Sequence, residues 1–193
     1  MKVHRFGFRR IWMLVLMMAA FSHRAHAASW SMSDGLDSGV AANWSCWQSE
    51  SAAGNSCKYD EGTFGLNVQS SGVGMTNMYT VNGVTGWSDT GRHVRLTPFQ
   101  QGRQLSCTAE MTVLPHYLTR PDVQLEVIDS STWTYVSTQR LKFSAASLPF
   151  AKVKMVTPVW VPPTRDVFVR IGIIGSGTFA KLYVDGLVVR CSY

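Results

Sequence analysis

Apolar and polar residues alternate with a period of two along several segments of the chain. In residues 103–113 (RQLSCTAEMTV), one face carries the apolar residues Leu105, Cys107, Ala109, Met111 and Val113, and the other face is polar. Successive side chains of a β-strand point to opposite faces of a sheet, so this pattern predicts a strand with one buried face. After residue 27, no segment has the sustained period of 3.6 that indicates an amphipathic helix.

The same alternation predicts a strand at 122–128 (DVQLEVI), with Gln124 and Glu126 on its polar face. Two apolar segments, 167–174 and 182–191, flank a Gly-Ser-Gly turn. Turn residues separate further strands, which we expect at 64–68, 77–81, 93–96, 133–140 and 151–155. About nine short strands, each with one polar and one apolar face, predict an all-β fold: a two-sheet antiparallel β-sandwich, or jelly roll.

Residues 31–62 are rich in Ser, Gly and Asn, and this composition predicts loops. Trp44, Cys46 and Trp47 would hold the segment against the rest of the domain. We interpret Trp44, Trp47 and Trp160 as core residues or as cover for a disulfide, because large aromatic side chains are on average highly buried.

The first 27 residues have the organisation of a secretory signal peptide. A basic stretch at 2–10 precedes an apolar stretch at 11–21, and 25–27 (AHA) matches a small-x-small cleavage site. A membrane helix needs about 20 apolar residues, roughly twice the length found here. We therefore expect a leader at 1–27 and a single domain at 28–193. The product would be secreted, extracellular or periplasmic, without membrane insertion after cleavage; an uncleaved N-terminal anchor is the alternative.

Removal of the leader changes the charge balance. The whole chain has 18 Lys and Arg residues against 12 Asp and Glu residues, and five of the basic residues lie in 1–27. The mature part therefore has 13 basic and 12 acidic residues, a net charge of +1. This balance gives no indication of nucleic-acid or anionic membrane binding.

All four cysteines lie after the leader, at Cys46, Cys57, Cys107 and Cys191. An even number in an exported chain indicates two disulfides, for which three pairings are possible. We favour a local pair, Cys46–Cys57, and a long-range pair, Cys107–Cys191. A zinc site is the less favoured alternative, because no CxxC spacing occurs and the two mature histidines lack a ligand spacing to the cysteines.

Asp185 is the one acidic residue in the apolar segment 182–191. An unpaired charge in apolar surroundings is costly, so we expect its carboxylate to meet a cation, a set of backbone N–H donors or a metal ion. No second ionisable group lies at a catalytic spacing beside it, which disfavours catalysis.

Segments 98–113, 122–128 and 168–189 (FVRIGIIGSGTFAKLYVDGLVV) follow one another in an order known from one protein family. With the Tyr-Val-Asp at 183–185, they resemble the jelly-roll carbohydrate-binding modules of the family four, nine and twenty-two type, which are galactose-binding-like β-sandwiches. Residues 35–37 followed by Trp44 resemble the early part of that family more loosely. The resemblance covers most of 34–191 and implies a protein that binds a polysaccharide or glycoconjugate.

The resemblance also implies a structural calcium ion. The matching positions are Asp185 and Asp37, with Asp34 as a neighbour. Calcium takes carboxylate and carbonyl oxygens as ligands. Gly186 stands where these modules often have a second Asp, so one expected ligand is missing.

A sugar-binding face combines aromatic platforms with hydrogen-bonding side chains. The expected platforms are Trp87, Tyr79, Trp133 and Tyr135, and the expected hydrogen-bonding partners are Gln124, Glu126 and Arg95. For Trp87 and Trp133, burial against the sandwich is an equally good interpretation.

We favour non-catalytic, lectin-like carbohydrate binding over two alternatives. The first is a surface structural or adhesion β-sandwich that binds no sugar. The second is a jelly-roll enzyme, whose candidate residues would be Gln124, His116, Tyr117 and Arg120 in a polysaccharide lyase, or Glu110 and Glu126 on neighbouring polar faces in a glycosidase. No enzyme motif surrounds either set, so we expect no enzymatic activity.

Overall fold

The computed structural model describes residues 28–35, 44–48, 56–63, 69–77, 87–97, 99, 104–115, 122–143, 152–174 and 180–193. These residues contain eleven strands: β1 (Ser29–Asp34), β2 (Trp44–Gln48), β3 (Ser56–Thr63), β4 (Gln69–Asn77), β5 (Trp87–Arg95), β6 (Ser106–Pro115), β7 (Asp122–Asp129), β8 (Tyr135–Lys142), β9 (Val153–Val156), β10 (Asp166–Ile174) and β11 (Ala180–Ser192). Within these ranges, no helix is long and apolar enough to cross a membrane. The predicted leader lies outside them.

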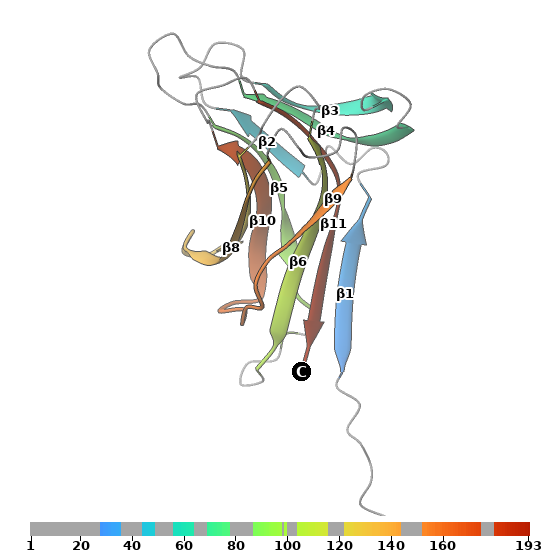
Figure 1. Ribbon diagram of the computed structural model, residues 1–193. Coiled ribbons are helices and arrows are strands. Elements are labelled where there is room, and N and C mark those ends of the chain that lie inside the picture. Colours follow the sequence, from blue (N-terminus) through green and yellow to red (C-terminus); the bar gives the residue numbers. More distant parts are fainter. Residues whose placement is uncertain are drawn as a thin grey trace, which may run out of the picture.

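The strands form two antiparallel sheets that make a β-sandwich (Figure 1). Sheet A has the order β3-β4-β11-β6-β9, and sheet B has the order β2-β5-β10-β7-β8. In sheet A, the long β11 pairs with β4 along its first half and with β1 along its second half. The predicted all-β, two-sheet antiparallel architecture is confirmed.

The core lies between the sheets and is built from the inward face of each alternating strand. In β7 and β10, the inward residues are fully buried: Val123, Leu125, Val127, Val167, Val169, Ile171 and Ile173. β6 and β11 supply the opposing side, with Met111, Val113, Val184 and Leu187 among the buried residues. Burial of each such side chain contributes roughly 1.5–3 kcal/mol. The residues between them are left to the outer faces of the two sheets.

The C-terminal strands match the predicted segments closely, because β6 to β11 fall on 103–113, 122–128, 133–140, 151–155, 167–174 and 182–191. The prediction of loops at 31–62 is wrong, since β2 and β3 lie there. Both are edge strands of their sheets. Edge strands have one unpaired side and carry polar residues, which weakens their alternation. The predicted strand at 64–68 and most of that at 77–81 lie outside the described residues.

A disulfide joins Cys107 of β6 to Cys191 of β11, which are opposite each other in the strand register. The predicted long-range pair is confirmed, and chain-entropy arguments give such a bridge about 4–5 kcal/mol. Trp160 is buried and exchanges two backbone hydrogen bonds with Cys107, as expected for a core residue. Cys46 is disulfide-bonded as well, but the side chain of Cys57 lies outside the described residues, so their pairing stays a prediction.

Candidate functional site

The outer face of sheet B aligns residues from five strands in rows. One row runs through Trp47, Asp89, Gly172, Gln124 and Arg140. The next runs through Ser45, Gly91, Arg170, Glu126 and Thr138, and a third through His93, Phe168, Ile128 and Tyr135. Neighbouring strands lie about 4.8 Å apart, so a five-strand row spans about 19 Å.

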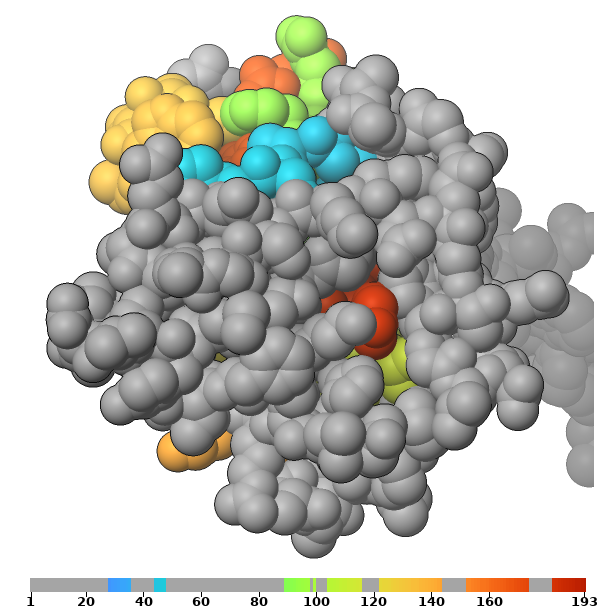
Figure 2. Space-filling view, turned by 90° about the horizontal axis from the view of Figure 1, so that it is seen from above, coloured from blue at the N-terminus to red at the C-terminus, as the bar shows by residue number. Residues whose placement is uncertain are grey.

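Some residues of these rows line a groove of about 670 Å³. Its lining residues come from β2, β5, β7, β8 and β10 and from the turn that carries Trp133. Figure 2 shows atoms of β2 (cyan), β5 (green) and β10 (orange) gathered on one side of the molecule with the yellow atoms of the β7–β8 region. Residues far apart in the sequence therefore share one concave surface.

Arg170 occupies the centre of the groove floor. Its Nε donates to Glu126 Oε2, its Nη2 donates to Tyr135 Oη at 3.3 Å, and its Nη1 lies 3.7 Å from Asp89 Oδ2. Glu126 and Asp89 are only 1% and 4% exposed. Isolated carboxylates would be costly at this depth, and the guanidinium offsets that cost. Gln124 Nε2 also donates to Glu126 Oε1.

Gly91 makes room for this arginine. The two residues are partners in the β5–β10 register, and a Cβ on Gly91 would lie 2.6 Å from Arg170 Cβ and 2.7 Å from the Val169 carbonyl oxygen. Both distances are shorter than real Cβ contacts, so any larger residue would force the strands or the arginine to move.

The surroundings of Arg170 keep it charged. Burial by itself lowers the pKa of the guanidinium, but hydrogen bonding and attraction to Glu126, with further attraction to Asp89 and Tyr135, raise that pKa above its ordinary value. A guanidinium is a planar group of five N–H donors with no acceptor. Among the described lining residues, the floor thus holds one guanidinium and two acidic side chains in fixed positions.

Three aromatic side chains with large exposed areas border this floor. Trp47, Trp133 and Tyr135 are 54%, 59% and 62% exposed. Trp47 belongs to the edge strand β2, whereas Tyr135 begins β8 at the opposite edge of the sheet. The groove therefore has a flat apolar surface at each edge and charged hydrogen-bonding groups between them.

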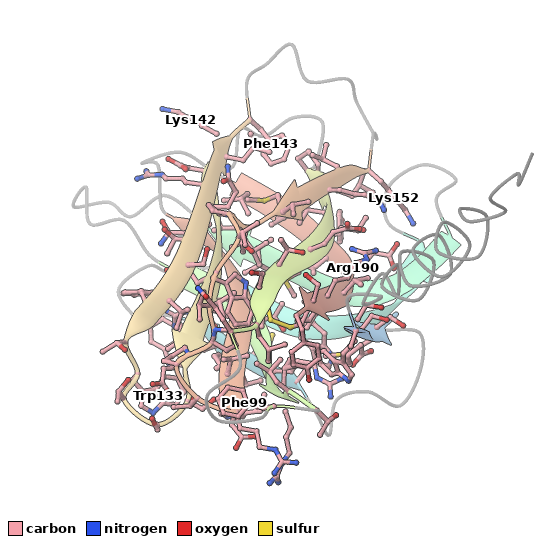
Figure 3. All side chains as sticks on the ribbon, turned by 90° about the horizontal axis from the view of Figure 1, so that it is seen from below. Phe99, Trp133, Lys142, Phe143, Lys152 and Arg190 are labelled. Carbon is pink, nitrogen blue, oxygen red and sulfur yellow. A yellow bond between two sulfur atoms is a disulfide. The ribbon has the colours of Figure 1, made fainter. Side chains whose placement is uncertain are left out.

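The Trp133 ring packs against two aromatic rings, one from β5 and one from β10. Its centroid lies 5.6 Å from that of Phe168, which is buried, and 6.3 Å from that of His93. Figure 3 shows Trp133 near one end of β8 and Lys142 at the other end. One side of the indole is supported by this packing while the rest of its surface stays exposed.

The structure brings four of the predicted binding residues into this one groove: Gln124, Glu126, Trp133 and Tyr135. Trp133 and Tyr135 have the exposure that a stacking platform needs. Glu126 is buried beneath Arg170, so it supports the guanidinium and offers little surface of its own.

Of the other predicted binding residues, only the side chain of Arg95 is described, and it lies outside the groove. Arg95 lies one row beyond His93, where its Nε is 3.9 Å from Asp166 Oδ1, and it does not line the groove. Trp87 begins β5 opposite Ile174, but its side chain lies outside the described residues, as does the whole of Tyr79. For these two residues the binding role stays a prediction.

The interpretation of Trp47 as a core residue is wrong, because its side chain is 54% exposed. In β2, Trp44 points toward the core and donates its Nε1 to Asp34 Oδ2 at 3.0 Å, whereas residue 47 falls on the opposite face. Sequence reasoning also missed Arg170 and Asp89. The available signal was Arg170 itself, the one charged side chain inside the apolar segment 167–174.

The predicted calcium ligands have other partners where the structure describes them. Asp185 Oδ2 lies 2.5 Å from Lys152 Nζ, which is the cation expected for this carboxylate. The Asp34 carboxylate accepts from Trp44 Nε1 and Arg92 Nη1, and Asp37 lies outside the described residues. Among the described side chains, no three His, Cys, Asp or Glu residues gather to hold a metal ion. The calcium site stays a prediction.

A β-bulge explains how Asp185 leaves the core. The register between β11 and β6 shifts between Val184 and Leu187, and both of these residues are buried although they are three apart. An inserted residue permits this odd spacing. Gly186 has a φ of 101°, a conformation that suits glycine, so this residue has a backbone role.

The two acids considered for a glycosidase are not a pair. Glu110 lies on β6 of sheet A, bound to Lys154 at 2.8 Å and to Arg190 at 3.1 Å, and Glu126 lies on sheet B. Their placement on neighbouring polar faces is therefore wrong, because the strands belong to different sheets. The lyase candidates His116, Tyr117 and Arg120 lie outside the described residues.

No protein-family model and no curated protein matches the sequence. Among solved structures, one match comes from work on the promiscuous specificity of carbohydrate-binding modules from the β-sandwich superfamily. It has a TM-score of 0.51 and 10% identity, and covers 74% of this chain and 55% of that chain. The chain has the β-sandwich fold of these modules.

Two further matches have TM-scores of 0.49, too low for any further conclusion. The CBM22-1 xylan-binding domain of Paenibacillus barcinonensis Xyn10C is 10% identical, over 83% of this chain and 92% of that chain. The K1 cleaved adhesin domain of Lys-gingipain from Porphyromonas gingivalis is 11% identical, over 83% of this chain and 97% of that chain.

Proposed function

We propose that this protein is a secreted, non-catalytic carbohydrate-binding protein, and that the groove on sheet B is its binding site. The single observation that supports this most is the combination of exposed aromatic side chains with a fixed polar floor. Trp47, Trp133 and Tyr135 offer flat apolar surfaces, and Arg170 and Gln124 offer hydrogen-bonding groups between them. Sugars present both kinds of surface, C–H faces and hydroxyl groups, to their binding sites.

The charge of the floor favours an uncharged polysaccharide or glycoconjugate. Among the described lining residues, the carboxylates of Glu126 and Asp89 lie beside one guanidinium, and we infer a preference for uncharged sugars over those with uronate or sulfate groups. The hydroxyl groups of a neutral sugar can accept hydrogen bonds from Arg170 without adding charge to the floor.

The same floor argues against hydrolysis. A glycosidase needs one carboxyl group that gives a proton to the leaving oxygen, and a second that acts on the sugar ring. Glu126 is almost fully buried and both floor acids are engaged by Arg170, so neither is free to reach a glycosidic bond. We propose binding without turnover.

Secretion is supported by the predicted leader and by the Cys107–Cys191 disulfide, which is the kind of bond found in exported proteins. N-terminal sequencing of the protein recovered outside the cytoplasm tests this proposal. We expect the mature chain to begin at Ala28; a chain that retains residues 1–27 would contradict it.

Binding is tested with insoluble polysaccharide pull-downs and a glycan array, followed by calorimetry on the best ligand. Trp133→Ala combined with Tyr135→Ala should abolish binding, and Val159→Ala, an exposed apolar residue outside the groove, should leave it unchanged. Release of reducing or unsaturated ends would contradict the non-catalytic assignment. Absence of binding to any glycan, with assembly or cell-surface association instead, would favour the adhesion alternative.

A further inference from the structure

Trp133 has an unusual backbone conformation. Its φ of 56° is the one positive value among the described residues other than glycine. The left-handed region is strained for an L-residue, and a bulky side chain rarely adopts it. Such a conformation persists only where contacts with the surrounding residues enforce it. Trp133 also lines the groove.

Asp129, at the end of β7, accepts several hydrogen bonds that hold this turn in place. Its Oδ1 accepts from the Ser131 backbone N–H at 2.9 Å, from Ser131 Oγ at 2.8 Å and from Thr164 Oγ1 at 3.0 Å. Its Oδ2 accepts from Thr132 Oγ1 at 3.1 Å. Two of the donor residues, Ser131 and Thr132, directly precede Trp133. The third, Thr164, links the turn to the segment before β10.

Backbone hydrogen bonds close the same turn. The Trp133 N–H donates to the Asp129 carbonyl at 2.8 Å, and the Asp129 N–H donates to the Thr134 carbonyl at 2.9 Å. His93, which packs edge-on to the indole, has its Nδ1 3.1 Å from Ser130 Oγ. The turn therefore holds both the backbone of Trp133 and one of the rings beside it.

Asp129 itself is buried and does not line the groove. It has no surface with which to contact a ligand, so any effect on binding must pass through the turn and Trp133. The hydrogen bond from the Ser131 N–H lowers the pKa of Asp129, burial opposes this, and the hydroxyl donors of Ser131, Thr164 and Thr132 lower the pKa further. The carboxylate is thus kept in its acceptor-only form.

We propose that Asp129 is a positioning residue for the groove: through Ser131, Thr132 and Thr164 it holds Trp133 in the left-handed conformation that presents the indole to a ligand. The ligand in this statement rests on the proposed function. The placement of the indole does not, and can be measured without a ligand.

A double-mutant cycle on the full mature chain tests this proposal. Asp129→Ala and Trp133→Ala should each weaken binding of the best polysaccharide by about tenfold or more, and the double variant should be no weaker than Trp133→Ala alone. Residues that act through one another give such non-additive effects. Additive losses, or an Asp129→Ala variant with the affinity of the unchanged protein, would overturn the proposal.

Asp122→Ala is the matched control. Asp122 is another buried acid of β7, bound to Arg140 through Nε at 2.8 Å and Nη2 at 2.6 Å, and it does not line the groove. It should lower stability without lowering affinity at 25 °C. Asp129→Asn should recover part of the affinity, because its amide oxygen still accepts the Ser131 N–H, and this variant serves if Asp129→Ala does not fold.

Acrylamide quenching provides the measurement that needs no ligand. The difference between the unchanged protein and Trp133→Phe isolates the emission of Trp133. Asp129→Ala should change the quenching constant of that difference by at least half, whereas Asp122→Ala should not. An unchanged constant overturns the positioning role, and a changed constant in a protein that binds no glycan supports that role while the proposed function fails.

Discussion

The two outer faces of this sandwich are built on the same alternation but carry different chemistry. On sheet B, an acid is buried under an arginine and exposed aromatic rings surround the pair. On sheet A, Glu110 meets the exposed side chains of Lys154 and Arg190, and serines of β1 stand beside them. Figure 3 places Trp133 and Lys142 on one side of the molecule and Arg190 and Lys152 on the other.

The difference is the one expected between a binding face, as proposed for sheet B, and a merely solvated face. Ion pairs at the surface contribute little to stability, because water screens them and the long side chains lose entropy. A charge network that is desolvated, together with rings that are left exposed, is costly to maintain without a ligand to use it. Only sheet B shows both features among the described residues.

Removal of the Arg170 side chain should give the largest difference in stability between the two faces. Arg170→Ala leaves Glu126 buried without its cation, and we expect a loss of about 3 kcal/mol in the free energy of unfolding. Arg190→Ala on sheet A leaves Glu110 bound to Lys154, and should cost less than about 1 kcal/mol. Urea unfolding of both variants at neutral pH measures the difference. Equal losses would show that the two networks are equally solvated.

A methyl group at Gly91 should act on the same floor by crowding. Gly91→Ala places a Cβ against Arg170 and the Val169 carbonyl, so we expect a loss of about 2 kcal/mol and weaker glycan binding. Thr138→Ala, in the same row on exposed β8, should change stability by less than about 0.5 kcal/mol. Thermal unfolding and calorimetry check both; an unaffected Gly91→Ala protein would mean that the strands shift freely.

The contribution of the groove edge to binding can be tested at Trp47, which the sequence did not predict to be exposed. Trp47→Ala should weaken polysaccharide binding by about tenfold, or about 1.4 kcal/mol, with little change in stability because the ring is exposed. The matched truncation on the other side, Val159→Ala, should have no effect. If Trp47→Ala binds normally but unfolds early, the ring serves the fold and the groove is narrower than described.

The smallest effect on stability is expected from low pH acting on Glu110 of sheet A. The hydrogen bond from Lys154 lowers the pKa of Glu110, with burial opposing and Arg190 adding to it. A lowered pKa means that the stabilisation is complete above the ordinary glutamate value, about pH 4, and is lost as the pH falls through the lower folded value. Glu110→Gln should therefore lower the free energy of unfolding slightly at all pH values above about 4, and should flatten its pH dependence below that value. A difference that persists at pH 7 and exceeds about 1 kcal/mol would place Glu110 among the buried acids.

The candidate site was only partly predictable from the sequence. Gln124 and Glu126 were placed on an outer face because they alternate with Val123, Leu125 and Val127. The outward position of Trp47 was not predictable, because the edge strand β2 has no clear alternation that would show which of its residues face outward. Arg95 lies outside the groove for another reason: it is on the same face but one row further along β5 than His93.

The sequence by itself determined which side chains of each regular strand face the core. A period of two assigns them without knowledge of the neighbouring strand, and it was enough for the two-sheet fold. The tertiary structure decided which strands lie beside one another and in what register. Arg170 meets Glu126, 44 positions away, because β10 pairs with β7 in one particular alignment. Such pairings depend on packing across the whole sandwich, and a one-residue shift would send every outward side chain to the other face.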